Sequence, residues 1–381
     1  MPHLLLEGNA ESYQNFLSSA PNATLVDASE DFYFQIQSIE GPTLQLRHVS
    51  TQGQATNHGE LPEAFMALML SFRPGSYSST SPLNETGRLS ETGLLSETGQ
   101  NSEAPTLHWH FANRSYINHH RNSKVTYLRM ESAALLRELC AQAIAVSQLP
   151  RLQGAASPAS LVQLIEDLSL QFTNADIQQQ PQLTEAFFNR LSQELRLLLG
   201  PPTASDANAA GHVSLAIEWM LSRLSEPINL QQLADAMGLT PRSVQACFKS
   251  VLAISPMRWL KLARISKLRQ FLWSGDMKHL SIQQLMGRCG LSENSLNRQC
   301  YKEAYGVSPM EERRQAESVK RKRGAIKKES KYCQFDKIDS GIKFLKQLNN
   351  FDGDNIPDNK ITITISSSTP EASCKPKLIE L

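Results

Sequence analysis

Short segments in which apolar and polar residues alternate, or in which aromatic and β-branched residues gather, occupy the first 130 residues. Turn-forming residues such as Gly41 and Pro42 separate these segments. Alternation with a period of two is typical of strands that bury one face. The pattern therefore predicts a β-rich region over residues 1–130, with strands at residues 24–26, 32–39, 43–49, 107–111 and 125–130.

From residue 131 onward the apolar residues recur at helical spacing. Leu135 and Leu139 begin this pattern, which two later clusters repeat. A spacing of three or four places apolar side chains on one helical face, so we expect three helices within residues 131–200 and a role for them in dimerisation. Gly200 and the two prolines after it, followed by small polar residues, predict a linker over residues 201–212.

Residues 230–251 have the pattern of two short helices joined by a tight turn. Asn229 is a good N-cap for a first helix over residues 230–237, whose apolar residues share one face. Gly238 supplies the turn, and Thr240 followed by proline supplies the N-cap and first helical residue of a second helix. This arrangement predicts a helix-turn-helix unit.

The same pattern returns from residue 281. Ser281 takes the place of the first N-cap, Gly290 that of the turn, and Ser292 is expected to cap the second helix. Each unit also ends in a similar phrase, ISPM at residues 254–257 and VSPM at residues 307–310. Many helical hairpins share a glycine and caps, so one unit would be weak evidence, but two matched units are specific.

A single long helix is predicted between the two units, over residues 256–273. At the usual rise, this length gives about 27 Å, which is comparable with the roughly 34 Å of one turn of DNA. One chain can therefore place both units on the same side of a duplex, in successive segments of the major groove.

These features together resemble the DNA-binding domain of the AraC/XylS family of transcription regulators, over residues 213–315. The resemblance implies that the second helix of each unit enters the major groove of double-stranded DNA. It further implies that an upstream domain senses a small-molecule effector or forms a homodimer, and that the protein is a bacterial activator that contacts RNA polymerase. The sequence has no segment that resembles a nucleophile elbow, a P-loop or a dinucleotide fingerprint, so we expect no cofactor and no catalytic residue.

The resemblance also assigns base contacts to positions on the two second helices. Arginine pairs with guanine and glutamine with adenine through two hydrogen bonds, which provides sequence discrimination. The simpler interpretation is that these are solvated residues opposite a buried face that includes Val244 and Phe248. The candidates for base contact are Arg242, Gln245 and Ala246 in the first unit and Asn294, Ser295, Arg298 and Gln299 in the second.

The register of the second unit is less secure than that of the first. Family members carry a bulky apolar residue at the position of Asn297, and Leu296 stands one position early in this chain. Two interpretations stay open: this helix is rotated, or it contacts DNA weakly.

Basic residues in and around both units are candidates for phosphate contact, which adds affinity without sequence information. A solvated surface charge is the alternative for each of them. The candidates are Lys249, Arg258, Lys261, Lys267, Lys302, Arg313 and Arg314.

Charge is distributed unevenly along the chain. Residues 1–212 hold 11 Lys/Arg against 20 Asp/Glu, whereas residues 213–315 hold 14 against 8. Only the second part is therefore expected to approach a polyanion. A basic, mostly disordered tail is predicted over residues 316–381, and three hexapeptide repeats predict a disordered loop over about residues 78–104.

Few features favour other classes of protein. The six cysteines lack the spacing of a zinc site or a disulfide framework. His108, His110, His119 and His120 suggest a metal site, but no carboxylate at a matching spacing completes it, so we expect no metal. A metal-dependent enzyme is a distant alternative, and a module for protein contacts or unspecific DNA binding is a nearer one.

The predicted architecture is an α+β multidomain protein, in which a β-rich sensing or dimerisation domain and its following helices precede an all-α domain of two helix-turn-helix units. The first residues lack a basic segment followed by a sustained apolar stretch, and no apolar run is long enough to cross a bilayer. We therefore expect a cytoplasmic protein without membrane contact.

Overall fold

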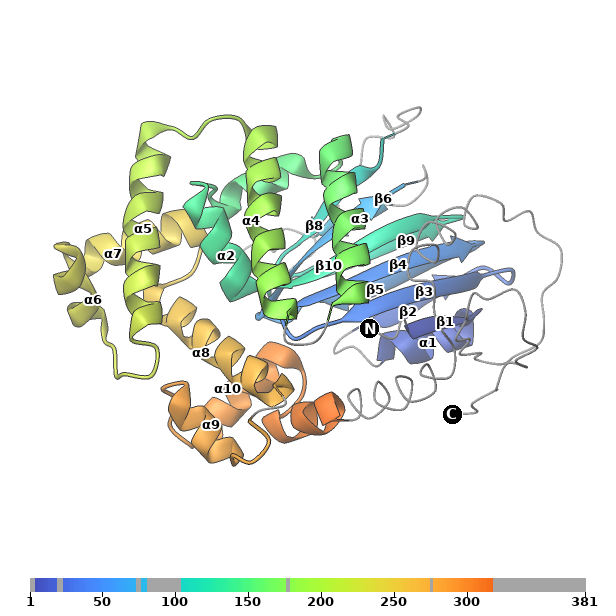
Figure 1. Cartoon of the computed structure of the whole chain (residues 1–381). Coiled ribbons are helices and arrows are strands. Elements are labelled where there is room, and N and C mark those ends of the chain that lie inside the picture. The colour runs from blue at the N-terminus through green and yellow to red at the C-terminus, as the bar shows by residue number, and fades with distance from the viewer. Residues whose placement is uncertain are drawn as a thin grey trace.

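The computed structural model describes residues 4–18, 23–72, 77–80, 104–175, 179–274 and 277–317. Two antiparallel sheets form the N-terminal half, and helices form the C-terminal half (Figure 1). The hexapeptide repeats and residues 318–381 of the predicted tail lie outside the described residues. Among the described helices, none has the length and apolar character needed to cross a membrane.

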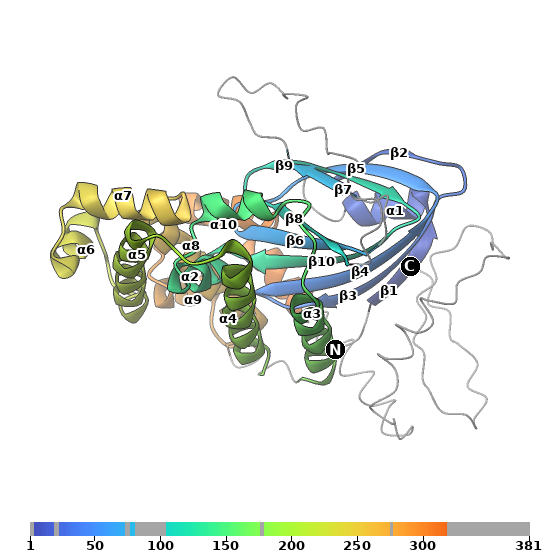
Figure 2. The ribbon, with the colours of Figure 1, turned by 90° about the horizontal axis from the view of Figure 1, so that it is seen from above.

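Six strands form one sheet, in the order β1-β3-β4-β10-β6-β8, and four form the other, in the order β2-β5-β9-β7. Figure 2 shows the two sheets as stacked layers. The strands are β1 Leu4–Asn9, β2 Thr24–Ala28, β3 Tyr33–Glu40, β4 Leu44–Gln52, β5 Gln54–Glu60, β6 Phe65–Ser71, β7 Tyr77–Thr80, β8 Thr106–His110, β9 Ser115–Arg121 and β10 Lys124–Glu131.

The five strands predicted from alternation are confirmed, and the structure adds five more. All seven residues of β6 are buried, so this strand has no polar face and its sequence cannot alternate. Conversely, β5 and β9 carry polar residues on both faces. Period-two patterns detect strands with one apolar and one polar face, and these three strands do not have that form.

Helices cover the outer face of the six-stranded sheet, and Figure 2 shows α3 and α4 on the side opposite the four-stranded sheet. Leu46 and Leu128 from the sheet share one core with Leu161 and Leu191 from these helices. The predicted helical pattern after residue 131 is confirmed. The helices are α1 Ala10–Ser18, α2 Ser132–Ala141, the 3-10 helix η1 Val146–Leu152, α3 Ala159–Asn174 and α4 Gln180–Leu199.

Most of the predicted linker over residues 201–212 is instead the first half of helix α5, Ala204–Ser222. Thr203 caps this helix by accepting a hydrogen bond from the backbone N–H of Asp206, and several alanines favour helix. The helix packs against α2, where the Cys140 thiol donates to the carbonyl of Ala210 at 3.3 Å. The linker prediction was wrong because small residues that are common in linkers also suit a packed helix.

The two helix-turn-helix units follow at the places that the sequence predicts. The first consists of α6 Leu230–Met237 and α7 Pro241–Leu252, the second of α9 Ile282–Arg288 and α10 Ser295–Tyr305. Helix α8, Pro256–Trp273, joins them, and residues 309–317 form a last helical segment. In both views α6 and α7 lie at the end of the molecule farthest from the sheets (Figures 1 and 2).

The turn glycines of the two units have the same backbone conformation but different surroundings. Gly238 has φ +63° and Gly290 has φ +68°, both in the left-handed region that favours glycine. No heavy atom lies within 4 Å of where a Cβ on Gly238 would stand, whereas a Cβ on Gly290 would stand 2.5 Å from the carbonyl oxygen of Leu224. Only the second turn is therefore closed in by another segment.

A buried ion pair joins α8 to the last helical segment. Arg269 Nε lies 3.1 Å from Glu312 Oε1, which also accepts a hydrogen bond of 2.7 Å from Trp273 Nε1. The same guanidinium donates to the carbonyl of Pro42, between β3 and β4, at 2.7 Å. Burial by itself would lower the pKa of Arg269, but Glu312 raises it above its ordinary value. The Arg269–Glu312 pair therefore connects the C-terminal region to the sheet.

A second set of buried contacts lies beside this pair. Glu131, the last residue of β10, accepts hydrogen bonds from Ser266 of α8 at 2.6 Å and from Tyr305 of α10. The Tyr305 ring packs edge-on against Phe65 of β6, with ring centroids 5.5 Å apart. Helices α8 and α10 are thus fixed against one end of the sheet.

Replacing Gly290 by alanine should destabilise the protein more than replacing Gly238. Both changes force alanine into the left-handed region, at a cost of about 1 to 2 kcal/mol. Only Gly290→Ala adds an overlap with backbone, of the kind that costs about 1 to 3 kcal/mol more. Urea unfolding monitored by circular dichroism measures both, and equal midpoints for the two variants would contradict the packing of this turn.

Removing the charge of Arg269 should be strongly destabilising. Arg269→Met leaves the Glu312 carboxylate buried without its partner, a change that costs about 3 to 5 kcal/mol. The matched control is Arg298→Met, which breaks the exposed pair with Glu293 and should cost at most about 1 kcal/mol. Thermal unfolding of the two variants measures both losses of stability. Similar losses would show that the Arg269–Glu312 pair does not connect the C-terminal region to the sheet.

Candidate DNA-binding surface

Helix α7 exposes four residues that the sequence assigns to DNA contact. Arg242, Gln245, Ala246 and Lys249 are all exposed, while the opposite face buries residues that include Phe248. Thr240 caps the helix by accepting from the backbone N–H of Ser243, and Pro241 begins it. The pattern places the polar and apolar residues on opposite faces, as the sequence predicts.

The polar groups on this face of α7 are available to a ligand. Within the part of the chain that the structure describes, the side chains of Arg242 and Gln245 form no hydrogen bond or ion pair. A helix fits the width of the major groove, where arginine and glutamine match the edges of guanine and adenine. The exposed, unengaged side chains can therefore bond to bases without first breaking contacts within the protein.

Helix α10 has the orientation that the family pattern requires, in spite of its polar residue at the apolar position. Asn297 is buried and Leu296 is 67% exposed. The Asn297 amide donates to the carbonyl of Ser292 at 2.6 Å, and its oxygen accepts from the ammonium of Lys261. These bonds satisfy a buried amide, so the hypothesis of a rotated second helix is wrong.

The cap of α10 differs from the prediction. Asn294, not Ser292, accepts the hydrogen bond from the backbone N–H of Asn297, at 2.7 Å. The Asn294 amide also donates to the Ser292 hydroxyl at 3.0 Å. A residue predicted to contact bases therefore has its side chain engaged at the start of the helix.

The remaining predicted base-contact residues of α10 are exposed but bound to acidic neighbours. Ser295, Arg298 and Gln299 lie on the surface. Arg298 forms an ion pair with Glu293, and the Gln299 amide donates to Glu303 at 3.0 Å. DNA would have to compete with these carboxylates, which also repel phosphates.

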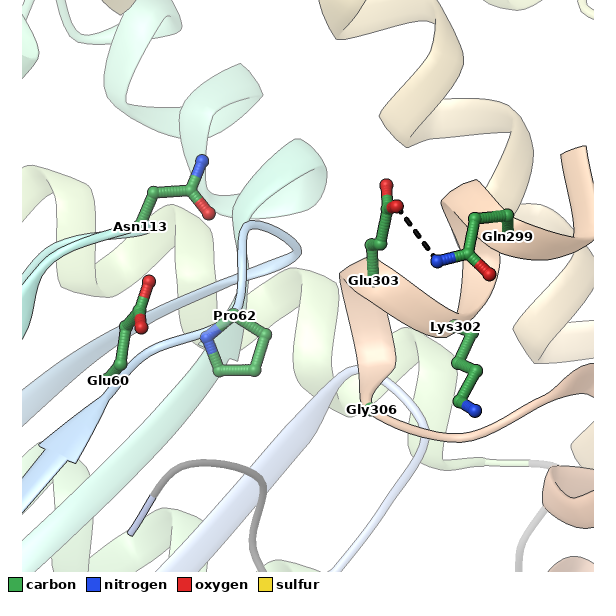
Figure 3. Close-up of a pocket in the computed structure, with 7 residues that line it drawn as sticks. All are labelled: Glu60, Pro62, Asn113, Gln299, Lys302, Glu303 and Gly306. Carbon is green, nitrogen blue, oxygen red and sulfur yellow. Dashed lines mark hydrogen bonds between the residues drawn. The ribbon is translucent and has the colours of Figure 1, made fainter. Parts of the chain in front are cut away.

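One side of α10 borders a cleft of about 260 Å³ that faces the β-rich region. Figure 3 shows Gln299 and Lys302 on the helix and Pro62 and Asn113 across the cleft. The β-rich region therefore stands beside this helix, whereas it is distant from α6 and α7 in both overall views.

The predicted phosphate-contact residues fall into two groups. Lys249, Lys302 and Arg314 are exposed, and Arg313 is half-buried. The three candidates on α8 are engaged within the protein: Arg258 pairs with Glu63, Lys261 with Asn297, and Lys267 lies 5.1 Å from the ring centroid of Phe271. Sequence alone did not reveal the Arg258–Glu63 pair, because its partner lies far away in the chain.

The four histidines of the metal hypothesis do not converge. His108 and His110 lie on one face of β8, while His120 bonds to Asn57 and Ser123 and His119 to Thr56. Burial, and then repulsion from His108, lowers the pKa of His110 to about 3. Within the described residues, no group of three or more His, Cys, Asp or Glu side chains is placed to hold a metal ion.

A model of the helix-turn-helix domain matches residues 233–315. Among curated proteins, a probable thc operon regulatory protein of Rhodococcus erythropolis is 32% identical over 104 residues, or 27% of this chain and 31% of that protein. The HTH-type transcriptional activator RhaS of Escherichia coli is 24% identical over 121 residues, or 31% of this chain and 42% of that protein. The match thus spans less than half the length of each relative.

Solved structures are similar to the chain at low TM-scores. A transcriptional regulator of Chromobacterium violaceum with an AraC-type DNA-binding domain is 27% identical with a TM-score of 0.26, over 29% of this chain and 96% of that chain. ToxT of Vibrio cholerae is 11% identical with a TM-score of 0.36, over 75% of this chain and 98% of that chain. The matched sequence and the paired units show that residues 233–315 form a helix-turn-helix domain.

Proposed function

We propose that this protein is a sequence-specific transcription regulator that activates its targets. Its two helix-turn-helix units contact successive segments of the major groove, and a small-molecule effector bound by the β-rich region controls it. RNA polymerase and a second copy of the chain, bound through residues 131–200, are its further proposed partners. Residues 1–130, 131–200 and 213–315 are the corresponding functional regions.

One observation carries this proposal: α7 presents exposed, unengaged Arg242 and Gln245 on a capped helix opposite a buried face. Base contact requires donor groups that have no partner within the protein and that a rigid helix presents on its exposed face. Helix α7 meets both requirements. Helix α10 is the weaker contact, because Glu293 and Glu303 hold its polar side chains. Base selectivity is therefore assigned mainly to the first unit.

Two other functions are compatible with a pair of helical hairpins. A module for protein contacts would not need arginine and glutamine on the exposed face of α7, and an unspecific DNA-binding protein would not distinguish sequences. A metal-dependent enzyme would need a metal site in the β-rich region, where the described histidines face different partners. The exposed face of α7 favours sequence-specific binding.

Selection of duplexes from a random DNA pool by the purified full chain tests this function. We expect enrichment of one motif with two parts about one helical turn apart, and a salt-dependent shift of that duplex in a gel. Equal recovery of all sequences would assign the protein to unspecific binding, and no recovery would overturn DNA binding.

Alanine substitutions at Arg242 and Lys249 should have different effects. Loss of a two-bond contact to guanine costs about 1 to 3 kcal/mol and relaxes selectivity at one base pair. Loss of a phosphate contact instead weakens binding to all sequences and lowers the salt dependence. Titration of the selected duplex and of single-base variants, at several salt concentrations, measures both effects. If Arg242→Ala weakens binding to all of these duplexes equally, Arg242 contacts phosphate and not a base.

Removing the carboxylates of α10 should strengthen DNA binding. The double variant Glu293→Gln, Glu303→Gln frees Arg298 and Gln299 and removes two negative charges from this face. Surface charge effects of about 0.5 to 1 kcal/mol correspond to an increase in affinity of about two- to fivefold. Glu185→Gln on α4 is the matched control, because this glutamate is 63% exposed and lies outside both units. Unchanged affinity in the double variant would show that α10 stays away from the duplex.

A further inference from the structure

Helix α10 carries a large apolar side chain on its exposed side. Leu296 is the second residue of this helix and is 67% exposed. It precedes Gln299 by three residues, so the two side chains lie on the same side of the helix. The opposite side is packed, with Tyr301 and Ala304 almost fully buried. The leucine therefore shares a face with a residue that the sequence assigns to base contact.

The packing of the domain does not account for this leucine. An apolar side chain stabilises a fold through the surface that it removes from water, and Leu296 keeps most of its surface in water. The neighbouring buried position is taken by Asn297, whose amide is satisfied by Ser292 and Lys261. Single exposed leucines are common on protein surfaces, so exposure alone indicates no function. The place of Leu296 within the second unit is the informative feature.

Leu296 lies in the first turn of α10. The N-terminal residues of the second helix in a helix-turn-helix unit are those that contact base edges in the major groove. The residues of α10 that border the cleft toward the β-rich region come later in the helix, namely Gln299, Lys302 and Glu303 (Figure 3). The exposed leucine therefore stands where units of this kind contact bases.

The polar side chains around this turn have partners within the protein. Asn294 donates to the Ser292 hydroxyl. Arg298 forms its ion pair with Glu293. Base contact by either of them requires the exchange of these bonds, whereas an apolar side chain has no such bonds to exchange. The apolar group that a base pair presents in the major groove is the 5-methyl group of thymine, and contact with it would remove the exposed surface of Leu296 from water.

We propose that Leu296 contacts the 5-methyl group of a thymine in the DNA segment bound by the second unit, and thereby selects thymine at that base pair. This inference rests on the proposed function, because it names the base that one position of the second unit selects. The first unit then discriminates bases through the hydrogen bonds of Arg242 and Gln245, and the second through an apolar contact. The carboxylates beside α10 do not compete with a contact of this kind.

Replacement of single thymines by deoxyuridine tests the contact, because it removes the methyl group and keeps every hydrogen-bonding group of the base pair. The probe is the duplex that the full chain enriches from random DNA, with each thymine replaced in turn. We expect one thymine whose replacement weakens binding by the unmodified chain about three- to fourfold, the effect of exposing one methyl-sized group. Equilibrium titration of each duplex at constant salt measures this change.

Variants of exposed leucines connect the methyl effect to Leu296. Leu296→Ala should bind the thymine and deoxyuridine forms of this duplex with equal affinity. Leu296→Met keeps an apolar side chain of similar volume and should retain the preference for thymine. Leu197→Ala on α4 is the matched control, because this leucine is 77% exposed and lies outside both units, and it should retain the full preference. Surface substitutions of this kind change stability little, so the thermal unfolding curves of all three should match that of the unmodified chain.

Three results would overturn the proposal. The first is a selected duplex in which no thymine replacement weakens binding, and the second is an undiminished methyl effect in Leu296→Ala. The third is a loss of affinity by Leu296→Ala that is equal for both forms while the methyl effect remains, which would assign the leucine to another contact. An enriched motif without a methyl effect removes this inference alone, whereas the absence of any enriched motif removes the proposed function as well.

Discussion

Arg269 is a buried guanidinium, and its charge must be balanced inside the protein. Glu312 balances it from the last helical segment, and the carbonyl of Pro42 accepts a further hydrogen bond from the β-rich region. A buried pair of this kind is costly to break because either partner alone would be an uncompensated charge. The position of α8 against the sheet, and with it the position of the second helix-turn-helix unit, depends on this contact.

The two units are unequal because their surroundings differ. The first lies at the end of the molecule, where α7 exposes polar side chains without partners. The second is held by Glu131, Phe65 and the Arg269–Glu312 pair, and its recognition face carries two glutamates beside a cleft. These surroundings support the proposal that base selectivity belongs mainly to the first unit, whereas the second unit is packed against the β-rich region.

Local chemistry determined most of the helix-turn-helix units, so the sequence by itself predicted them, apart from the cap and the register of α10. Caps such as Asn229 and Ser281, the glycines at the turns and the apolar faces act within a few residues, and the structure has each of them at its predicted place. Long-range packing decided the rest. Residues 204–212 are helical because α2 packs on them, β6 has no alternation because both of its faces are buried, and Asn297 fits a buried position because Lys261 and Ser292 satisfy its amide. The partners of Arg258 and Arg269 lie in distant parts of the chain, and only the folded protein brings them together.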